Sequence, residues 1–120
     1  PTRELLARLP HAMNTDDSLS ALADRLDQFA RARDWPRFHS PKNLASALIV
    51  EAAELLEPFQ WLTEEQSRQL PPEQRGAVAE ECADVLLYLV QLASTLGIDL
   101  VAEAHRKMDL NEQRFPPGSG

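Results

Sequence analysis

The chain is poor in glycine, cysteine and aromatic residues. Its 120 residues include 4 glycines, 1 cysteine and 6% aromatic residues. The single cysteine, Cys82, cannot form a disulfide within the chain, which favours a reducing compartment such as the cytoplasm. No stretch approaches the ~20 apolar residues of a transmembrane helix. The opening "PTRELLARLPHAMNTDD" also lacks the apolar block of a signal peptide. These absences predict a soluble cytoplasmic protein that does not associate with a membrane.

Positive charge is scarce as well. The 12 Lys and Arg residues are outnumbered by 19 Asp and Glu residues, and the formal net charge is -7. Proteins that bind nucleic acid polymers carry a basic surface for the phosphates, so the net charge argues against a general duplex-binding surface and we expect no nucleic acid polymer as a partner. The 43% hydrophobic and 26% charged residues are typical of one folded domain with a modest core. We expect this domain at residues 17–115, between flexible tails at residues 1–16 and 116–120.

Apolar residues recur with helical spacing throughout, and no alternating strand pattern persists. The pattern predicts an all-α fold. Serine before proline starts a helix well, threonine three residues before glutamine forms a capping box, and glycine after a helix ends it. The expected helices lie within 16–35, from Ser40-Pro41 to about Leu56, in a short turn capped by Thr63, from about Glu73 to Leu96 before Gly97, and from an Asp99 cap to about Arg114.

Two pairs of carboxylates lie beside apolar stripes. At 100° per residue, Glu51 and Glu54 fall at the edge of the stripe on the second helix, and Glu81 and Asp84 repeat the arrangement on the third. If these helices pack antiparallel, four acids converge and repel one another unless a cation lies between them. Mg²⁺ prefers oxygen ligands and bridges carboxylates to phosphates, so a magnesium site is one interpretation. Two solvated acidic helix faces are the other.

The aromatic residues in loops have two interpretations. Trp35, Phe38 and Trp61 lie in or beside loops, where aromatic rings can stack on a nucleobase or form a small satellite core. Cys82 lies on an apolar stripe, and we expect it to be a buried small hydrophobe. Apolar Val50 and Leu87 face away from the stripes and favour oligomerisation.

The last predicted helix carries three polar residues on one face. Lys107, Asn111 and Arg114 are spaced four and then three residues apart, which places them along one side of a helix. Their side chains can donate hydrogen bonds to a polyphosphate. The alternative is a solvated helix end, where Lys and Arg also favour the helix dipole.

The acidic pairs also resemble a known pattern. "EAAE" and "EECAD", with residues 55–80 between Glu54 and Glu81, resemble the E-x-x-E…E-x-x-D signature of the all-α nucleoside triphosphate pyrophosphohydrolases, the MazG-like superfamily. The stretches "RDWPRFHSPKNLASAL", "ELLEPFQW", "EECADVLLYLVQLA" and "KMDLNEQRFP" resemble its dCTP pyrophosphatase branch over residues 19 to 116.

This resemblance implies a four-helix MazG-like bundle, assembled as a homotetramer (a dimer of dimers) with active sites partly between subunits. It also implies Mg²⁺-dependent cleavage, with Mn²⁺ as a substitute, between the α- and β-phosphates of a nucleoside triphosphate. The implied metal ligands are Glu51, Glu54, Glu81 and Asp84, and we assign Glu54 as the general base. The implied substrate contacts are Trp35, Phe38, His39 and Trp61 around the base, Tyr88 near the sugar, and Lys107, Asn111 and Arg114 at the phosphates or ribose.

Two positions depart from the family pattern. Val50 stands where the superfamily often has an acid, a loss that the dCTP pyrophosphatase branch shares, and Asp27 aligns with a family histidine. We predict a pyrophosphohydrolase that acts on dCTP or a modified dCTP in nucleotide-pool sanitation. The alternatives are a broader house-cleaning NTP pyrophosphatase, a relative that cleaves phosphoribosyl-ATP or dUTP, and a non-catalytic helical oligomerisation module.

Overall fold

The structure, a computed structural model, describes residues 18–118, except for the side chain of Phe38. Its elements are α2 (Leu19–Ala32), the 3-10 helix η2 (Pro36–Phe38), α3 (Pro41–Leu56), α4 (Glu64–Ser67), α5 (Pro72–Thr95) and α6 (Leu100–Arg114). These residues contain no strand, which confirms the all-α class. The predicted N-terminal tail lies outside the described residues, and only residues 116–118 of the C-terminal tail are described. The domain span 17–115 stays a prediction.

Side-chain caps fix the starts of three helices. The side-chain oxygens of Ser18, Ser40 and Asp99 each accept a hydrogen bond at 3.1 Å from the backbone N–H three residues later. Such caps satisfy donors that the first helical turn leaves free. The predicted bounds of α3 and α6 are confirmed. Helix α2 is shorter than the predicted stretch 16–35, because the chain turns at Asp34, whose φ of 56° is incompatible with a right-handed helix.

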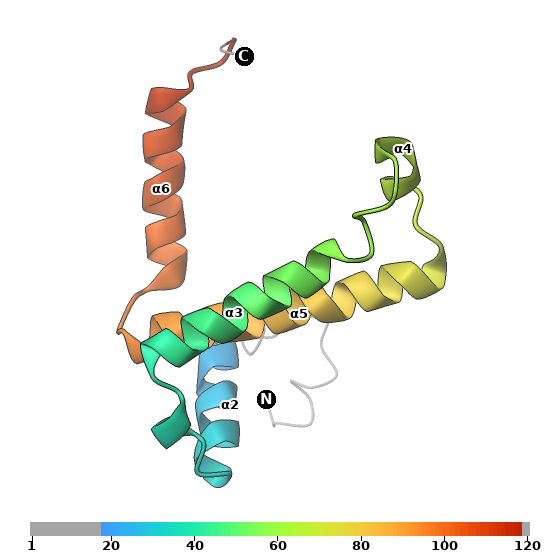
Figure 1. The fold of residues 1–120 in the computed structure, drawn as a ribbon. Coiled ribbons are helices and arrows are strands. Elements are labelled where there is room, and N and C mark those ends of the chain that lie inside the picture. The colour runs from blue at the N-terminus through green and yellow to red at the C-terminus, as the bar shows by residue number, and fades with distance from the viewer. Residues whose placement is uncertain (1–17, 119–120) are drawn as a thin grey trace, which may run out of the picture.

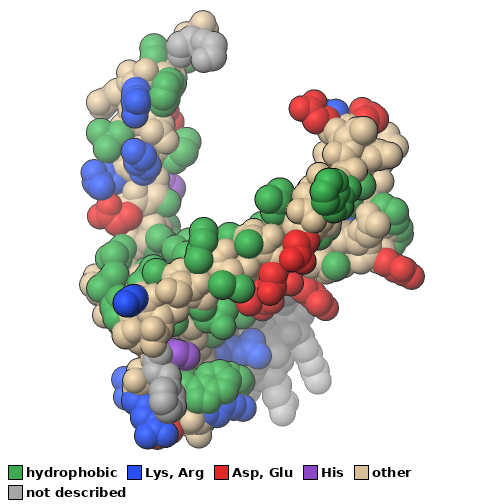
Figure 2. All heavy atoms as spheres, viewed as in Figure 1, with side chains coloured by type: hydrophobic (Ala, Val, Ile, Leu, Met, Phe, Trp, Pro, Cys, Tyr) green, Lys and Arg blue, Asp and Glu red, His purple; other side chains and the backbone are tan. Residues whose placement is uncertain are grey.

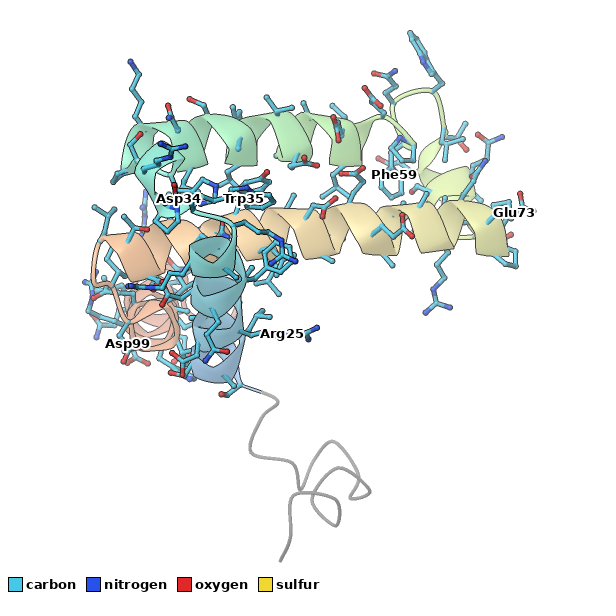
Figure 3. The ribbon with its side chains drawn as sticks, turned by 90° about the horizontal axis from the view of Figure 1, so that it is seen from below. Arg25, Asp34, Trp35, Phe59, Glu73 and Asp99 are labelled. Atoms are coloured by element: carbon cyan, nitrogen blue, oxygen red, sulfur yellow. The ribbon has the colours of Figure 1, made fainter. Side chains whose placement is uncertain are left out.

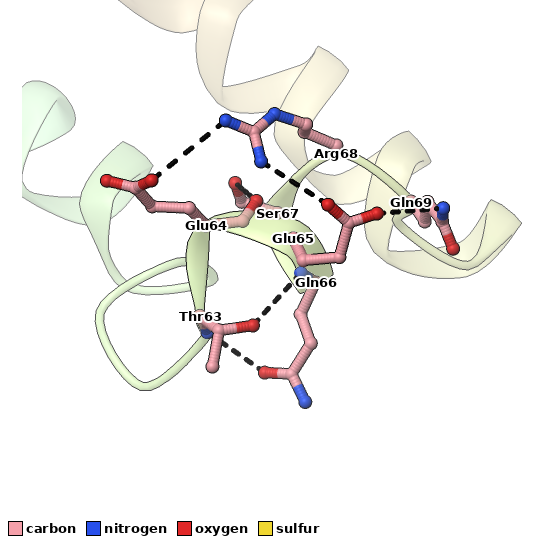
Figure 4. A network of polar contacts seen from close by, with 7 residues as sticks. All are labelled: Thr63, Glu64, Glu65, Gln66, Ser67, Arg68 and Gln69. Carbon is pink, nitrogen blue, oxygen red and sulfur yellow. Dashed lines mark hydrogen bonds and ion pairs between the residues drawn. The ribbon is translucent and has the colours of Figure 1, made fainter.

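A capping box orders the connection between α3 and α5 (Figure 4). Thr63 Oγ1 accepts a hydrogen bond from the Gln66 N–H at 3.1 Å, and the Thr63 N–H donates to Gln66 Oε1 at 3.0 Å. This confirms the predicted Thr63–Gln66 pair. Arg68 also pairs with Glu65 at 3.4 Å, although an exposed ion pair of this kind adds little stability. The box therefore shapes the loop that returns the chain antiparallel to α3.

Helices α3 and α5 lie side by side and antiparallel, and α2 packs against α5 (Figures 1 and 3). The buried apolar residues lie where these three helices meet: Ala30, Leu44, Val90 and Ala93. Leu44 is the only large side chain that is fully buried among residues 18–118. Small residues from α2 and α5 let the helix backbones approach closely. The core therefore sits at one end of the α3–α5 pair.

The expected four-helix bundle does not close within one chain. Helix α6 leaves α5 at an angle of 100° and stands away from the other helices (Figure 1). The radius of gyration is 17.9 Å, whereas a compact domain of about 100 residues has roughly 13 Å. Cys82 is exposed, so its predicted burial is wrong in the single chain, because nothing in the described part covers its side of α5. Ile49, Val50 and Leu56 on α3 are more than half exposed as well.

Among the described helices, none is by itself long and apolar enough to cross a membrane. Helices α5 and α6 reach the required length and composition only as a pair, across their 100° bend.

Alanine substitutions at two glycines should change the free energy of unfolding in opposite directions. Gly97 has a φ of +68° at the end of α5, where alanine is strained, so Gly97→Ala should lower the free energy of unfolding by about 1 kcal/mol. Gly76 lies inside α5, and a Cβ there meets no atom within 4 Å. Gly76→Ala should therefore raise the free energy of unfolding by about 0.5–1 kcal/mol.

Urea denaturation at one fixed protein concentration measures both changes. Both variants add one methyl group to the same helix, Gly97→Ala at its end and Gly76→Ala in its interior. Each variant therefore serves as the control for the other. Stabilisation by Gly97→Ala would show that this residue does not need the left-handed conformation.

Candidate metal centre

Helices α3 and α5 bring four carboxylates to their shared face. Glu51 and Glu54 lie one turn apart on α3, Glu81 and Asp84 do the same on α5, and all four side chains are half-buried. Figure 2 shows acidic side chains gathered over the middle of this helix pair, while basic side chains lie over α6 and around α2. The antiparallel arrangement expected for the two acidic pairs is confirmed.

Three of the four acids converge closely. Glu51, Glu81 and Asp84 each offer a carboxylate oxygen, and these oxygens lie within 4.8 Å of one another. The Oε2 atoms of Glu51 and Glu81 are enclosed, and neither has a hydrogen-bond partner in the described part of the chain. Enclosed carboxylate oxygens without donors are unfavourable. An all-oxygen set of this kind suits a hard divalent cation, so the cluster of Glu51, Glu81 and Asp84 can hold a metal ion.

Glu54 lies beside this cluster but is not one of the three converging residues. Burial raises the pKa of Glu51, and the neighbouring Glu81 carboxyl raises it further. The pKa of Glu54 is also raised, chiefly by its side-chain hydrogen bond to Glu51 and by the charge of that group. A cation has the opposite effect on such carboxyls, because it favours their ionised form.

The turn between α2 and α3 holds part of the predicted nucleotide site. Trp35 lies there, with its ring edge-on to Phe29 at 5.5 Å and to His39 at 6.1 Å between centroids (Figure 3). Tyr88 lies one turn beyond Asp84 on α5 and is half-buried. Phe38 lies in η2, and its side chain is outside the described set. Trp35 and His39 are therefore together, and Tyr88 lies between them and the acids along the helix pair.

A cavity of about 160 Å³ opens beside His39, between α2, α3 and α5. Its lining includes Asp27, Leu44 and Gln91. Of these, the sequence interpretation noted Asp27 only as a departure and did not single out Gln91. The available signal was the spacing: Gln91 follows Asp84 by seven residues, and Leu44 precedes Glu51 by seven, which keeps each pair on one helix face.

The remaining predicted contacts lie elsewhere in the chain. Trp61 follows the C-terminal end of α3 and is 86% exposed. The 16 residues of α3 span about 24 Å and separate Trp61 from His39. Lys107, Asn111 and Arg114 lie on α6, which stands away from the acidic cluster (Figure 1). One chain alone therefore does not bring Trp61 to His39, nor the three α6 residues to the acids.

Comparison with known proteins gives consistent matches. A model of the MazG-like family matches residues 47–117. The dCTP pyrophosphatase 1 of Mus musculus is 42% identical over 112 residues, which cover 92% of this chain and 66% of that protein. The dCTP pyrophosphatase 1 of Homo sapiens is 45% identical over 91 residues, which cover 74% of this chain and 54% of that protein.

The fold also matches a solved structure. A pyrophosphatase from Archaeoglobus fulgidus DSM 4304 superimposes with a TM-score of 0.77 at 39% identity, covering 82% of this chain and 92% of that one. The all-α architecture described above is therefore shared with it. The chain spans less than two thirds of the length of the curated relatives that it matches.

The raised pKa of Glu51 predicts a pH dependence of stability without metal. The folded chain binds the Glu51 proton more tightly than the unfolded chain does. The free energy of unfolding should therefore fall as the pH rises from below the ordinary value of 4.5 through the raised pKa. Urea denaturation in the presence of a chelator measures this fall. Added Mg²⁺ should reverse it, because the ion binds the ionised carboxylates of the folded chain.

Glu51→Gln should reduce this fall, because it removes the Glu51 carboxyl and the chief cause of the raised pKa of Glu54, and it should remove the stabilisation by Mg²⁺. Glu80→Gln is the matched control, since Glu80 is exposed on the same helix as Glu81 and should leave both effects intact. Equal stabilisation of the two variants by Mg²⁺ would contradict a metal site at Glu51.

Proposed function

The chain belongs to the MazG-like family, and on that basis we propose that it is a Mg²⁺-dependent nucleoside triphosphate pyrophosphohydrolase. The observation that carries this proposal is the convergence of Glu51, Glu81 and Asp84, two of which have enclosed oxygens without partners. The names of the similar proteins, dCTP pyrophosphatase 1 and pyrophosphatase, support the same reaction class. A non-catalytic helical module would leave the Oε2 atoms of Glu51 and Glu81 enclosed without a hydrogen-bond partner.

Glu51, Glu81 and Asp84 would hold the cation, with Glu54 as the fourth ligand expected from the sequence. When bound, Mg²⁺ supplies positive charge against the phosphoryl oxygens and acidifies water. The carboxylates bind the cation rather than the phosphates, since like charges on protein and substrate would otherwise repel. Mn²⁺, which also accepts carboxylate ligands, should substitute.

Glu54 is the proposed general base. Because it lies outside the three closely converging residues, as a fourth ligand it would be only partly engaged with the cation, and its carboxylate could accept a proton. In the proposed reaction a water oxygen bonds to the α-phosphorus as the bond from this phosphorus to the α–β bridging oxygen breaks. The water proton passes to Glu54, and the electron pair leaves with pyrophosphate. The products are the nucleoside monophosphate and pyrophosphate.

The proposed substrate is dCTP or a modified dCTP. This choice follows the family branch that the sequence resembles and the printed names of the curated relatives. Trp35, Phe38, His39 and Trp61 would surround the base and Tyr88 the sugar. Cleavage of unwanted deoxynucleotides in the cytoplasm, as nucleotide-pool sanitation, is the corresponding proposed role.

We propose that the active site forms between subunits of a homotetramer, a dimer of dimers. In the same chain, Trp61 lies too far from His39, and α6 too far from the acids, to form one site. The corresponding residues of another copy can complete it. The exposed apolar residues of α3 and α6, among them Ile49, Val50 and Met108, support this assembly. Basic side chains on α6, which lie beside acidic ones such as Glu103, can approach the acidic α3–α5 face of another copy (Figure 2).

Pyrophosphate release from each canonical dNTP, with and without Mg²⁺, tests the proposed activity. The wild type should release pyrophosphate only with a divalent cation, and most readily from dCTP. Glu54→Gln should lower kcat by at least about 100-fold, because it removes the proton acceptor. Asp84→Ala should abolish the activity by removing a metal ligand.

Glu80→Gln is again the matched control and should retain the wild-type kcat. If the protein releases no pyrophosphate from any nucleoside triphosphate, the proposed enzymatic activity is refuted. Unchanged kcat in Glu54→Gln would refute only the role of Glu54, and comparable rates for all dNTPs would establish the broader house-cleaning activity.

Light scattering tests the assembly. The mass in solution should be about four times the 13.4 kDa of the chain. Val50→Glu, which places a charge on an exposed apolar position of α3, should lower this mass and the activity together. A monomer with full activity would contradict a site shared between subunits.

A further inference from the structure

The cavity between α2, α3 and α5 has the size of a single aromatic ring. Its volume is about 160 Å³, and a cavity of about 150 Å³ accommodates benzene. A pyrimidine base has the same six-membered frame, whereas a purine has a second ring. Leu26, Ala30, Pro36 and Leu44 supply apolar walls, and Asp27, His39 and Gln91 are polar members of the lining. The cavity therefore combines apolar walls with a few polar groups, as ligand sites do.

The cavity lies at a suitable distance from the acidic cluster. Leu44 and Gln91 line it, and they lie seven residues from Glu51 and Asp84 on their respective helices. Seven residues correspond to about 10 Å along a helix. Tyr88 lies on the intervening stretch of α5. A base in the cavity would thus be separated from phosphates at the cluster by a length of helix that the sugar can bridge.

Asp27 gives this cavity a hydrogen-bond acceptor. Its Oδ2 accepts a hydrogen bond from Arg31 Nε at 2.8 Å, which orients the carboxylate. The other carboxylate oxygen can still accept, and an ionised carboxylate has no hydrogen to donate. Cytosine presents an amino group at its C4 position, where thymine presents a carbonyl oxygen. A carboxylate therefore accepts a hydrogen bond from the amino group of cytosine and repels the carbonyl oxygen of thymine.

We propose that Asp27 accepts a hydrogen bond from the exocyclic amino group of a pyrimidine base held in this cavity. Asp27 would thereby select cytosine nucleotides over uracil and thymine nucleotides. This inference rests on the proposed function and adds the residue that distinguishes the bases. Gln91 has both a donor and an acceptor, so it can serve the other polar atoms of the ring. Asp27 acts on binding of the base and takes no part in bond cleavage.

Binding of dCMP and dUMP in the presence of Mg²⁺, measured by calorimetry, tests this without requiring hydrolysis. The wild type should bind dCMP at least about tenfold more tightly than dUMP, because with dUMP the hydrogen bond to Asp27 is lost and replaced by repulsion. In Asp27→Asn this preference should fall by at least about tenfold, since an amide can pair with an amino group or with a carbonyl. The kcat/KM ratio of dCTP to dUTP should change in parallel.

Two control variants separate recognition from a structural role of Asp27. Arg31→Gln removes the ion pair but keeps the carboxylate, and Asp24→Asn removes a charge one turn earlier on α2. Both should keep the preference for dCMP. Equal wild-type affinities for dCMP and dUMP, no binding of either, or an unchanged preference in Asp27→Asn would each overturn the inference. Failure of the proposed enzyme would instead appear as the absence of pyrophosphate release, whatever the binding preference.

Discussion

Repulsion between carboxylates at the α3–α5 interface governs what this helix pair can hold. The two helices pack along one face, and that face carries Glu51, Glu81 and Asp84 with oxygens within 4.8 Å of one another. Packing alone would favour apolar residues there. A cation resolves the conflict because it turns mutual repulsion into shared coordination. The helix pair is therefore a scaffold whose middle section can hold a metal ion and whose end holds the small apolar core.

The helices themselves are predictable from the sequence because their signals are local. The Ser40–Pro41 start, the Thr63–Gln66 capping box and the Gly97 stop each involve residues within one turn, and the structure confirms them. The acidic face follows from helical periodicity in the same way. Asp34 shows the limit of local signals, since nothing in the periodicity of residues 16–35 indicates that the helix ends at Ala32.

Features that depend on distant contacts are less predictable. The apolar position of Cys82 suggested burial, yet burial requires a covering element, and α5 has none at that place in the described chain. The 100° turn into α6 likewise follows from the loop conformation at Gly97 to Asp99, and helical spacing does not encode it. The cavity at Asp27 and Gln91 joins residues of different helices. These features require the tertiary arrangement, and for α6 and Trp61 the proposed assembly of several chains as well.

A crystal grown with Mn²⁺ tests the proposed metal site at Glu51, Glu81 and Asp84, because anomalous scattering locates this ion without reference to activity. We expect one or more anomalous peaks between α3 and α5, within coordination distance of oxygens from Glu51, Glu81 and Asp84. An ordered Lys or Arg from another copy between these carboxylates, with no anomalous peak, would contradict it. In that case an ion pair, and not a metal, would resolve the repulsion.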